Sequence, residues 1–533
     1  MKGMSEEMEK TFEKFKCFQL LNKPADKNAE FIRLLFAIKE KPLPTDPDNI
    51  RVRVAADGSR QSPHTYEHTH AATSDQHQRS FVFAATLADC ASRDCFDRLK
   101  VTGFDLTSAF INGNALTRAL TGGIQLITRI PDSDLIDDKY RNKLAEFTGP
   151  VNGLKQANFI FEQDLIKTLE TAGFMRLPSA PCVFHKRCPI DPKDYITVPM
   201  NVDDGISLST SDVLLAELKN VLTTRYGHID FVNNPPNMCG VHYNYHENGI
   251  SLDNGPYLRR ALKTLGMDEV PPALTPSLAD FFDAPTDLTP ASEKQQEAFA
   301  TVNGIMVFTI PIRHDYRMET SHLCKSNSNP TKSDIAKQFQ LLRYAKGTTD
   351  IGPFFSADPA DHPNGVEISA STDVAFNVDS STGGSRNAHT LQVGRPGAHT
   401  SPFLAHSAVD STISLSPAEA EYISASHTAK QLLYWRQFAE DLGFPQNLSS
   451  VILEDNASAI KLANSPQIPT KSRHIALKFH HIRDLVRRKV IELRHCTTQK
   501  MVTDSMTKVT PPPLFLYNRS ILFPRALLQL KTT

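Results

Sequence analysis

Two neighbouring acids stand between apolar residues in the segment ITVPMNVDDGISLS, at positions 196–209. The apolar residues on both sides predict two strands joined by a tight turn over Asp203, Asp204 and Gly205. Asp and Gly are common turn residues, so an ordinary hairpin accounts for this pattern. The alternative is that a carboxylate at the strand tip holds a divalent metal ion. Such an ion needs hard oxygen ligands and at least one more carboxylate from elsewhere.

Other acids could supply such ligands. Asp105 ends a predicted strand in GFDLTSAF. A second set lies in the C-terminal third, where Asp373 falls on a strand in STDVAFN, Asp455 ends a strand in LEDNASAI, and Asp504 stands near a helix start in TDSMTK. Taken singly, each of these acids is more typical of a surface residue or a cap than of a metal ligand.

The segment LSPAEAEYISAS predicts the start of a helix. Ser416 is the expected N-cap, Pro417 is the first helical residue, and Glu419 is expected to return to the cap as a capping box. Glu421 lies two residues further, roughly 200° around the helix from Glu419. It is therefore free to point into a site.

The elements that must position these acids alternate between helix and strand. Helical spacing covers 4–18, SFVFAATLADCASRDC, GPVNGLKQANFIFEQDLIKTLETAGF and LLAELKNVLTTRYG, and IRVRVAADGSRQ alternates as a strand. A Pro- and Asp-rich stretch, DEVPPALTPSLADFFDAPTDLTPASEKQ, reads as a linker, and a helical block at 295–347 follows it. Beyond SADPADHPNG strands return, so we expect two α/β or α+β domains with a helical piece between them.

Length and composition indicate an intracellular multidomain protein. The chain has 533 residues, 40% of them apolar and 22% charged, which is typical of globular proteins of two to four domains. No apolar run approaches a membrane span, and the acidic, helical N-terminus is unlike a signal peptide. The eight cysteines form no C-x-x-C pair, so reduced structural thiols are expected rather than zinc ligands.

Charge is unevenly distributed along the chain. Positions 461–533 carry 14 Lys and Arg against 3 acids, a net charge of +11, so the remainder carries −12 of the total of −1. This basic end predicts either a surface that faces phosphates or a solvated helix face with an exposed tail.

The motifs together resemble a known family. FDLTSAFINGNAL, VNGLKQANFIFEQDLIKTLETAGF, SAPCVF and NVDDGISL resemble, in order and character, the reverse transcriptase of copia-type long-terminal-repeat retrotransposons. The resemblance implies a right-hand fingers, palm and thumb fold in which Asp105 and Asp203, with Asp204 beside them, bind two Mg²⁺ or Mn²⁺ ions. The ions would activate a DNA primer 3′-hydroxyl and hold a deoxynucleoside triphosphate on an RNA template.

Three further residues gain roles from this resemblance. RVRVAADGSRQ resembles the fingers strand that meets the incoming triphosphate, with Arg53 as the candidate; the alternative is a strand-edge Arg in solvent. GLKQ resembles the segment under the nucleotide, so Gln156 would touch its sugar or base and Lys155 a phosphate. The alternative for both is a helix N-terminus without a ligand role.

The second set of acids resembles the ribonuclease H domain that follows the polymerase in the same family. The resemblance implies that Asp373, Glu421, Asp455 and Asp504 hold two metal ions that activate water against the RNA strand of an RNA–DNA hybrid. KSRHIALKFHHIRDLVRR also resembles the family. We expect His474, His480 and His481 to pack and contact phosphate rather than bind metal.

The expected class is therefore α+β: a polymerase followed by a helical connection and an α/β ribonuclease H-like domain. The expected limits are fingers, palm and thumb at 1–267, linker and connection at 268–365, the ribonuclease H-like domain at 366–510 and a C-terminal tail at 511–533. No protease, zinc-knuckle or integrase motif is present, so we expect the downstream end of a polyprotein or an isolated reading frame. By the resemblance it would act in the cytoplasm, the nucleus or a virus-like particle, alongside other element-encoded proteins and away from membranes.

Four positions depart from the family pattern. Asn201 replaces the usual Tyr before Val-Asp-Asp, Pro199 removes a donor from the same strand, Asn152 replaces an aromatic residue, and Ala476 replaces an acid. Two alternatives to an active enzyme therefore stay open. One is a weakened remnant that still binds primer–template, and the other is a non-catalytic structural or assembly subunit.

Overall fold

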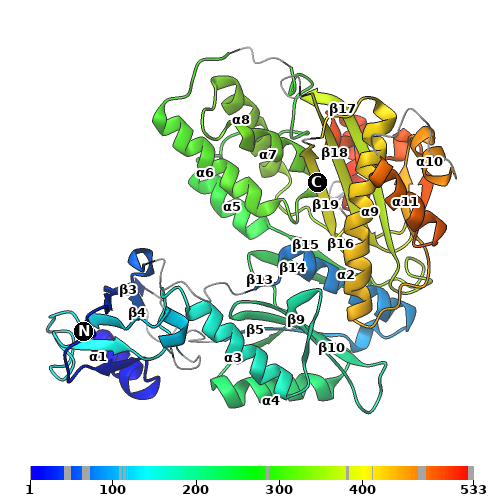
Figure 1. Ribbon diagram of the computed structural model, residues 1–533. Coiled ribbons are helices and arrows are strands. Elements are labelled where there is room, and N and C mark those ends of the chain that lie inside the picture. The colour runs from blue at the N-terminus through cyan, green and yellow to red at the C-terminus, as the bar shows by residue number, and fades with distance from the viewer. Residues whose placement is uncertain are drawn as a thin grey trace.

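The computed structural model describes residues 2–40, 50–62, 72–106, 111, 116, 118–283, 287–379, 383–410, 412–465 and 476–525. The N-terminal part forms a small lobe at one end of the molecule (Figure 1). One sheet has the order β1-β7-β6-β2, and β3 and β4 form a separate hairpin. The elements of this lobe are α1 (Lys2–Glu9), β1 (Phe18–Leu20), β2 (Glu30–Phe31), β3 (Leu34–Glu40), β4 (Ile50–Ala56), β6 (Leu126–Arg129) and β7 (Leu144–Phe147).

A six-stranded sheet of order β12-β5-β11-β10-β9-β8 follows this lobe. Its strands alternate their side chains between two faces. Ile206 and Leu208 face helix α2, whereas Ile196 and Val198 pack against α3 and α4. The elements are α2 (Gln76–Ser92), β5 (Lys100–Asp105), α3 (Ala157–Thr171), β8 (Met175–Leu177), β9 (Ala180–Arg187), β10 (Tyr195–Asn201), β11 (Asp204–Ser209), α4 (Asp212–Tyr226) and β12 (Phe231–Asn233).

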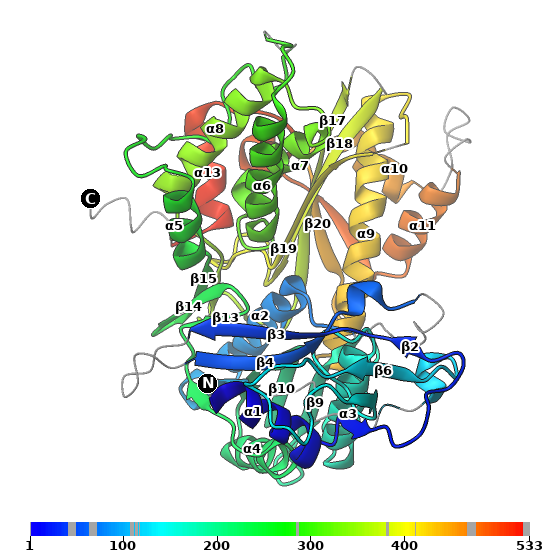
Figure 2. The ribbon, with the colours of Figure 1, turned by 90° about the vertical axis from the view of Figure 1, so that its left-hand side faces the viewer.

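A four-stranded sheet and a group of helices form the next layer. Figure 2 shows α5, α6, α8 and α13 side by side, away from the N-terminal lobe. The ring of Phe515 in α13 lies 5.7 Å from that of Tyr344 in α8, so the expected tail contains a packed helix. The elements are β13 (Asn237–Met238), β14 (Val241–His246), β15 (Gly249–Asp253), α5 (Gly255–Thr264), α6 (Glu293–Thr309), α7 (Arg317–Leu323), α8 (Lys332–Gly347), β16 (Phe354–Ser356) and α13 (Pro512–Leu522).

The last unit is a five-stranded sheet of order β19-β18-β17-β20-β21. β17, β18 and β19 are antiparallel, whereas β20 and β21 run parallel to β17. The long helix α9 covers one face (Figure 1). The elements are β17 (Ile368–Asp379), β18 (Gly384–Val393), β19 (Leu404–Val409), α9 (Pro417–Asp441), β20 (Ser450–Glu454), α10 (Ala457–Asn464), α11 (Ala476–Arg487), β21 (Ile491–His495) and α12 (Asp504–Thr507).

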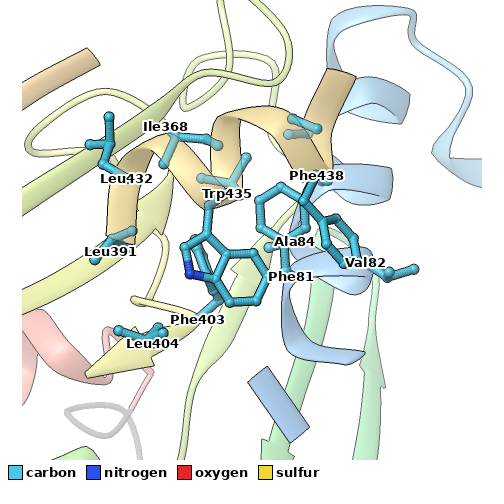
Figure 3. Packing of buried hydrophobic residues seen from close by; sticks show 14 of the residues in the cluster. Phe81, Val82, Ala84, Ile368, Leu391, Phe403, Leu404, Leu432, Trp435 and Phe438 are labelled. Atoms are coloured by element: carbon cyan, nitrogen blue, oxygen red, sulfur yellow. The ribbon is translucent and has the colours of Figure 1, made fainter. Parts of the chain in front are cut away.

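Helix α2 joins the two large sheets through one hydrophobic core. Every residue from Arg79 to Ala88 is buried, so the helix is enclosed on all sides over most of its length. The ring of Phe81 lies 4.9 Å from Phe403, 5.0 Å from Trp435 and 5.1 Å from Phe438 (Figure 3). The two sheets are therefore held together by continuous packing rather than by a flexible tether.

These elements confirm the predicted α+β class. Within the described ranges, no helix is both long enough and apolar enough to cross a membrane. The domain limits given above stay a proposal.

Candidate active sites

The first site lies where β5 and β11 end side by side. Asp204 pairs directly with Asp105 across this antiparallel ladder, and the backbone N–H of Leu106 donates to the Asp203 carbonyl at 2.9 Å. Residues opposite each other on an antiparallel pair have Cβ atoms about 5 Å apart. The fold therefore brings Asp105 next to Asp203 and Asp204, although almost a hundred residues separate it from them in the sequence.

The turn between β10 and β11 differs from the expected Asp-Asp-Gly turn. Asn201 pairs with Asp204, so the two loop residues are Val202 and Asp203, and Gly205 lies within the strand. A Cβ at Gly205 would meet the Phe104 ring and the Met200 sulfur, so close packing explains this glycine. Val202 has φ 61°, a left-handed conformation that costs a β-branched residue about 1–3 kcal/mol. Such strain is concentrated at functional sites.

Pro199 leaves the hairpin in register. Before Pro199, Thr197 pairs with Leu208 of β11. After it, Met200 pairs with Gly205, so the pairing of β10 with β11 does not shift across the proline. Pro199 itself pairs with Val183 of β9 on the other side. Since a one-residue slip would turn Asp204 to the opposite face of the sheet, keeping the register preserves the position of this carboxylate.

Like charges crowd this site. Burial raises the pKa of Asp204 to about 6, with further contributions from Asp203 and Asp105 and an opposing one from Arg79. Burial also raises the pKa of Asp203, which Asp105 raises further and Arg53 lowers. A divalent cation would relieve this repulsion, and oxygen-only donors suit Mg²⁺ or Mn²⁺.

A cleft of about 960 Å³ opens beside these carboxylates. Asp105 and Asp204 line it, together with Cys239 of the β13–β14 turn and Tyr257 of α5. The Asn201 side-chain amide donates to the Cys239 sulfur at 3.4 Å, and this sulfur lies 4.0 Å from a carboxylate oxygen of Asp204. Asn201, which stands where the copia-type pattern has Tyr, thus contacts Cys239 beside the hairpin.

The three predicted nucleotide-binding residues lie in different surroundings. Arg53 is exposed on β4, and its charge reaches Asp203. Lys155 is exposed just before α3. Gln156 is fully buried; its amide oxygen accepts from the side chain of Gln61 at 2.9 Å and its nitrogen donates to the carbonyl of Leu120 at 3.2 Å. These bonds favour the structural alternative for Gln156.

Two glycines explain how ADGSRQ and NGLKQ come together. Ala56 donates its N–H to the Asn152 carbonyl at 2.6 Å. A Cβ on Gly58 would meet the Gly153 carbonyl, and one on Gly153, at φ 88°, would meet the carbonyl of Ala56. Only glycine permits so close an approach of the two backbones.

The second site joins three of the predicted acids. Asp373 lies on β17, Glu421 on α9 and Asp455 just after β20, and one carboxylate oxygen of each lies within 4.8 Å of the other two. Asp373 and Glu421 are buried, with 2% and 7% of their surface exposed. The parallel pairing of β17 with β20 places the two Asp residues at the same edge of the sheet.

Asp504 stands beside this group without joining it. Its carboxylate pairs at 2.8 Å with the ammonium of Lys508, the residue that directly follows α12. Its charge still raises the pKa of Asp373, which burial brings to about 6. The Thr507 hydroxyl donates to a carboxylate oxygen of Asp373 at 2.5 Å and thereby orients it.

The start of α9 differs in one detail from the expected capping box. Ser416 is the N-cap, its hydroxyl accepts from the Glu419 N–H at 3.2 Å, and Pro417 opens the helix as predicted. The Glu419 carboxylate, however, accepts from the N–H of Leu415 at 3.0 Å, one residue before the cap. The chain therefore bends so that the preceding N–H meets this carboxylate.

The second site also fits a cation. Burial, followed by the charges of Glu454 and Asp373, raises the pKa of Glu421 well above its usual range. One Glu421 oxygen is buried and has no hydrogen-bond partner among the described residues. A divalent ion would satisfy this oxygen.

Sequence reasoning missed several neighbours of the two sites: Arg79, Cys239, Glu454, Thr507 and Lys508. The motif TDSMTK contains Thr507 and Lys508, and the motif LEDNASAI contains Glu454. Their closeness in sequence to the predicted ligands Asp504 and Asp455 could therefore have indicated a role at the site. Arg79 and Cys239 reach the first site only through the packing of α2 and the β13–β14 turn, which no local pattern reveals.

The predicted basic surface is described in part. His474 lies outside the described residues, as do the side chains of Ala476 and His480; His481 is half-buried. Arg487 and Arg488 both pair with Asp484, at 2.6 and 3.3 Å. The surface of α11 is therefore partly neutralised by its own acid.

The sequence of this chain is similar to a known protein family and to known polyproteins. Residues 15–279 match the family described as reverse transcriptase (RNA-dependent DNA polymerase). The Pol polyprotein of transposon TNT 1-94 from Nicotiana tabacum is 23% identical over 520 residues, which cover 96% of this chain and 37% of that protein. The polyprotein of transposon RE1 from Arabidopsis thaliana is 23% identical over 407 residues, 76% of this chain and 26% of that protein. The chain thus spans 37% of the length of the first relative and 26% of the length of the second.

Two kinds of solved structure are also similar. A foamy viral protease-reverse transcriptase in complex with double-stranded DNA has a TM-score of 0.46 at 12% identity, covering 91% of this chain and 68% of that chain. The LC11 ribonuclease H1 in complex with RNA/DNA hybrid has a TM-score of 0.20 at 14% identity, covering 26% of this chain and 93% of that chain.

Proposed function

Through residues 15–279 the chain belongs to the reverse transcriptase family, within Pol polyproteins of the copia type, and from this premise we propose that it copies RNA into DNA and cleaves the RNA of the resulting hybrid. The observation that carries the proposal is that two separate carboxylate groups form, one around the Asp105–Asp204 pair and one around Asp373, Glu421 and Asp455. The six-stranded sheet is then the palm, and the five-stranded sheet is the ribonuclease H-like domain.

At the palm, Asp105, Asp203 and Asp204 would hold divalent ions. When bound, such ions lower the pKa of a primer 3′-hydroxyl and neutralise charge on a triphosphate. The chain's own contribution is to hold the carboxylates in fixed register, while Arg53 offers a cation to the phosphates from the fingers side. The cleft between the palm and α5 gives the primer end room beside Cys239 and Tyr257.

At the second site, Asp373, Glu421 and Asp455 would hold the metal, with Asp504 beside them. Thr507 fixes the orientation of Asp373, and the Lys508 ammonium holds Asp504. The Thr498 hydroxyl donates to Asp455 at 2.8 Å and limits its rotation. Such supporting bonds keep ligands in place for a water that attacks RNA.

Primer extension on an RNA template with Mg²⁺ or Mn²⁺ tests the proposal, run with wild type, Asp203→Asn and Glu421→Gln. We expect wild type to extend the primer and to cut the template. Asp203→Asn should abolish extension alone, and Glu421→Gln should abolish cleavage alone. If wild type incorporates nothing with either metal, the polymerase half of the proposal is wrong.

Two other functions remain distinguishable. A remnant weakened by Asn201 would bind primer–template, with an affinity that falls steeply as salt rises, but would not extend it. A structural or assembly subunit would bind neither hybrid nor metal. The preserved register at Pro199 favours the enzyme, and we propose that it acts inside cells on RNA template, DNA primer and deoxynucleoside triphosphates.

A further inference from the structure

Glu454 is a fully buried acid that neither predicted site includes. It is the last residue of β20, directly before Asp455, and none of its surface is exposed. Charged residues are almost never fully buried unless they are paired. Its burial therefore needs a physical reason.

The direction of its side chain follows from the strand. Alternate residues of a strand share one face, so Glu454 faces the same side as Ile452, which packs in one cluster with Ala425 and Ala429 of α9. Helix α9 also carries Glu421. In agreement, Glu454 is the charge that contributes most to the raised pKa of Glu421.

Only one of the two carboxylate oxygens of Glu454 accepts a hydrogen bond within the described part of the chain. One carboxylate oxygen accepts from the N–H of Asn456 at 3.1 Å. The other is buried and finds no hydrogen-bond partner in the part of the chain that is described, and the same is true of one oxygen of Glu421. Leaving a polar group buried and unpaired costs about 1–3 kcal/mol, and more for a charged group. Two such oxygens on neighbouring carboxyl groups are what a shared cation would satisfy.

We propose that Glu454, which lies outside the group formed by Asp373, Glu421 and Asp455, is a further metal ligand beside the second site, where it shares a divalent cation with Glu421. The inference rests on the proposed ribonuclease H function and adds a ligand on the α9 side of the sheet. Its donors are carboxylate oxygens only, so the chemistry fits Mg²⁺ or Mn²⁺. Asp455, Asp373 and Glu421 keep the places already described.

The test measures metal binding directly, by calorimetric titration of Mn²⁺ into the full chain. The background carries Asp203→Asn and Asp204→Asn, so that the palm does not contribute. Glu454→Gln keeps the shape and removes the charge. Glu492→Gln is the matched control, because Glu492 is an exposed acid on the next strand, paired with Arg494 at 3.0 Å.

We expect Glu454→Gln to weaken Mn²⁺ binding about 10–100-fold, the range seen when groups supporting a metal site are removed. Glu421→Gln should weaken it at least as much, and Glu492→Gln should leave it unchanged. If Glu421→Gln weakens binding and Glu454→Gln matches the control, the inference about Glu454 fails by itself. If neither variant weakens binding, the proposed metal site at this sheet fails with it.

A second variant, Glu454→Asp, keeps the proposal testable if Glu454→Gln does not fold. Glu454→Asp keeps the charge and withdraws the oxygens by one methylene. A partial loss of Mn²⁺ affinity, with metal-free thermal stability near that of wild type, supports the proposal. Wild-type affinity in Glu454→Asp overturns it, because a ligand oxygen displaced in this way could not coordinate equally well.

Discussion

Asp105 lies directly opposite Asp204 in the β5–β11 ladder, so the palm carries two carboxylates on adjacent strand ends. Burial and the neighbouring Asp203 and Asp105 raise the pKa of Asp204 to about 6. The ordinary value for an unfolded Asp is about 3.9. The folded state therefore binds this proton more tightly than the unfolded state does.

Asp204→Asn should for this reason change how metal-free stability depends on pH. The favourable contribution of protonated Asp204 is fully present below pH ~3.9 and is lost as pH rises to ~6. Thermal melting in a metal chelator should therefore show that the stability of Asp204→Asn rises relative to that of wild type between pH ~3.9 and ~6. Above this range, the difference in melting temperature between the two proteins should stay constant. An unchanged difference between Asp204→Asn and wild type from pH 4 to 7 would contradict the crowding of charges.

Local patterns in the sequence predicted where several of the candidate residues lie in the fold. Strand ends at Asp105 and Asp455 and the helix start at Ser416 follow from local patterns. The turn at Val202 did not follow, because a β-branched residue with φ 61° opposes the local conformational preference. The burial of Gln156 and Glu454 depends on partners distant in sequence or on another layer, which no local pattern reveals.

Substitutions at Gln156 and Lys155 should have different effects: the first on the stability of the fold, the second on nucleotide binding. Gln156→Ala removes the acceptor of the Gln61 amide in a fully buried place, which should lower the free energy of unfolding by about 1–3 kcal/mol. Lys155→Ala changes an exposed side chain and should leave stability within about 0.5 kcal/mol. Urea denaturation gives both values.

The same two variants test the role in catalysis. If Lys155 contacts a phosphate, Lys155→Ala raises the KM for nucleotide in primer extension. Gln156→Leu, which keeps the volume without the amide, should resemble Gln156→Ala in stability. A Gln156→Ala variant as stable as wild type, with only a raised KM, would restore the nucleotide-contact role for this residue.

Phe81 should couple the unfolding of the palm and the ribonuclease H-like domain. Its ring is fully buried against Phe403, Trp435 and Phe438 (Figure 3). Phe81→Ala should therefore cost about 3–5 kcal/mol. Phe339, with 45% of its surface exposed, is the matched control, and Phe339→Ala should cost much less.

Trp435 is the single tryptophan of the chain, so its fluorescence reports on this interface alone. In wild type, the fluorescence transition in urea should coincide with the loss of circular dichroism, because one core spans both sheets. Phe81→Ala should shift the fluorescence transition to lower urea. Two well-separated transitions in wild type would show that the domains unfold independently.

Thr507 should support RNA cleavage through Asp373. Thr507→Val keeps the shape of the buried side chain and removes the hydroxyl that donates to the Asp373 carboxylate at 2.5 Å. Loss of such a supporting bond typically costs about 10–100-fold in metal affinity or activity. We therefore expect RNA cleavage to need more Mg²⁺ for half its maximal rate, while primer extension stays unchanged.

Thr510→Val is the control, because the buried Thr510 hydroxyl has no hydrogen-bond partner within the described ranges. If Thr507→Val and Thr510→Val show the same Mg²⁺ dependence as wild type, the Thr507 hydroxyl does not position Asp373 for catalysis.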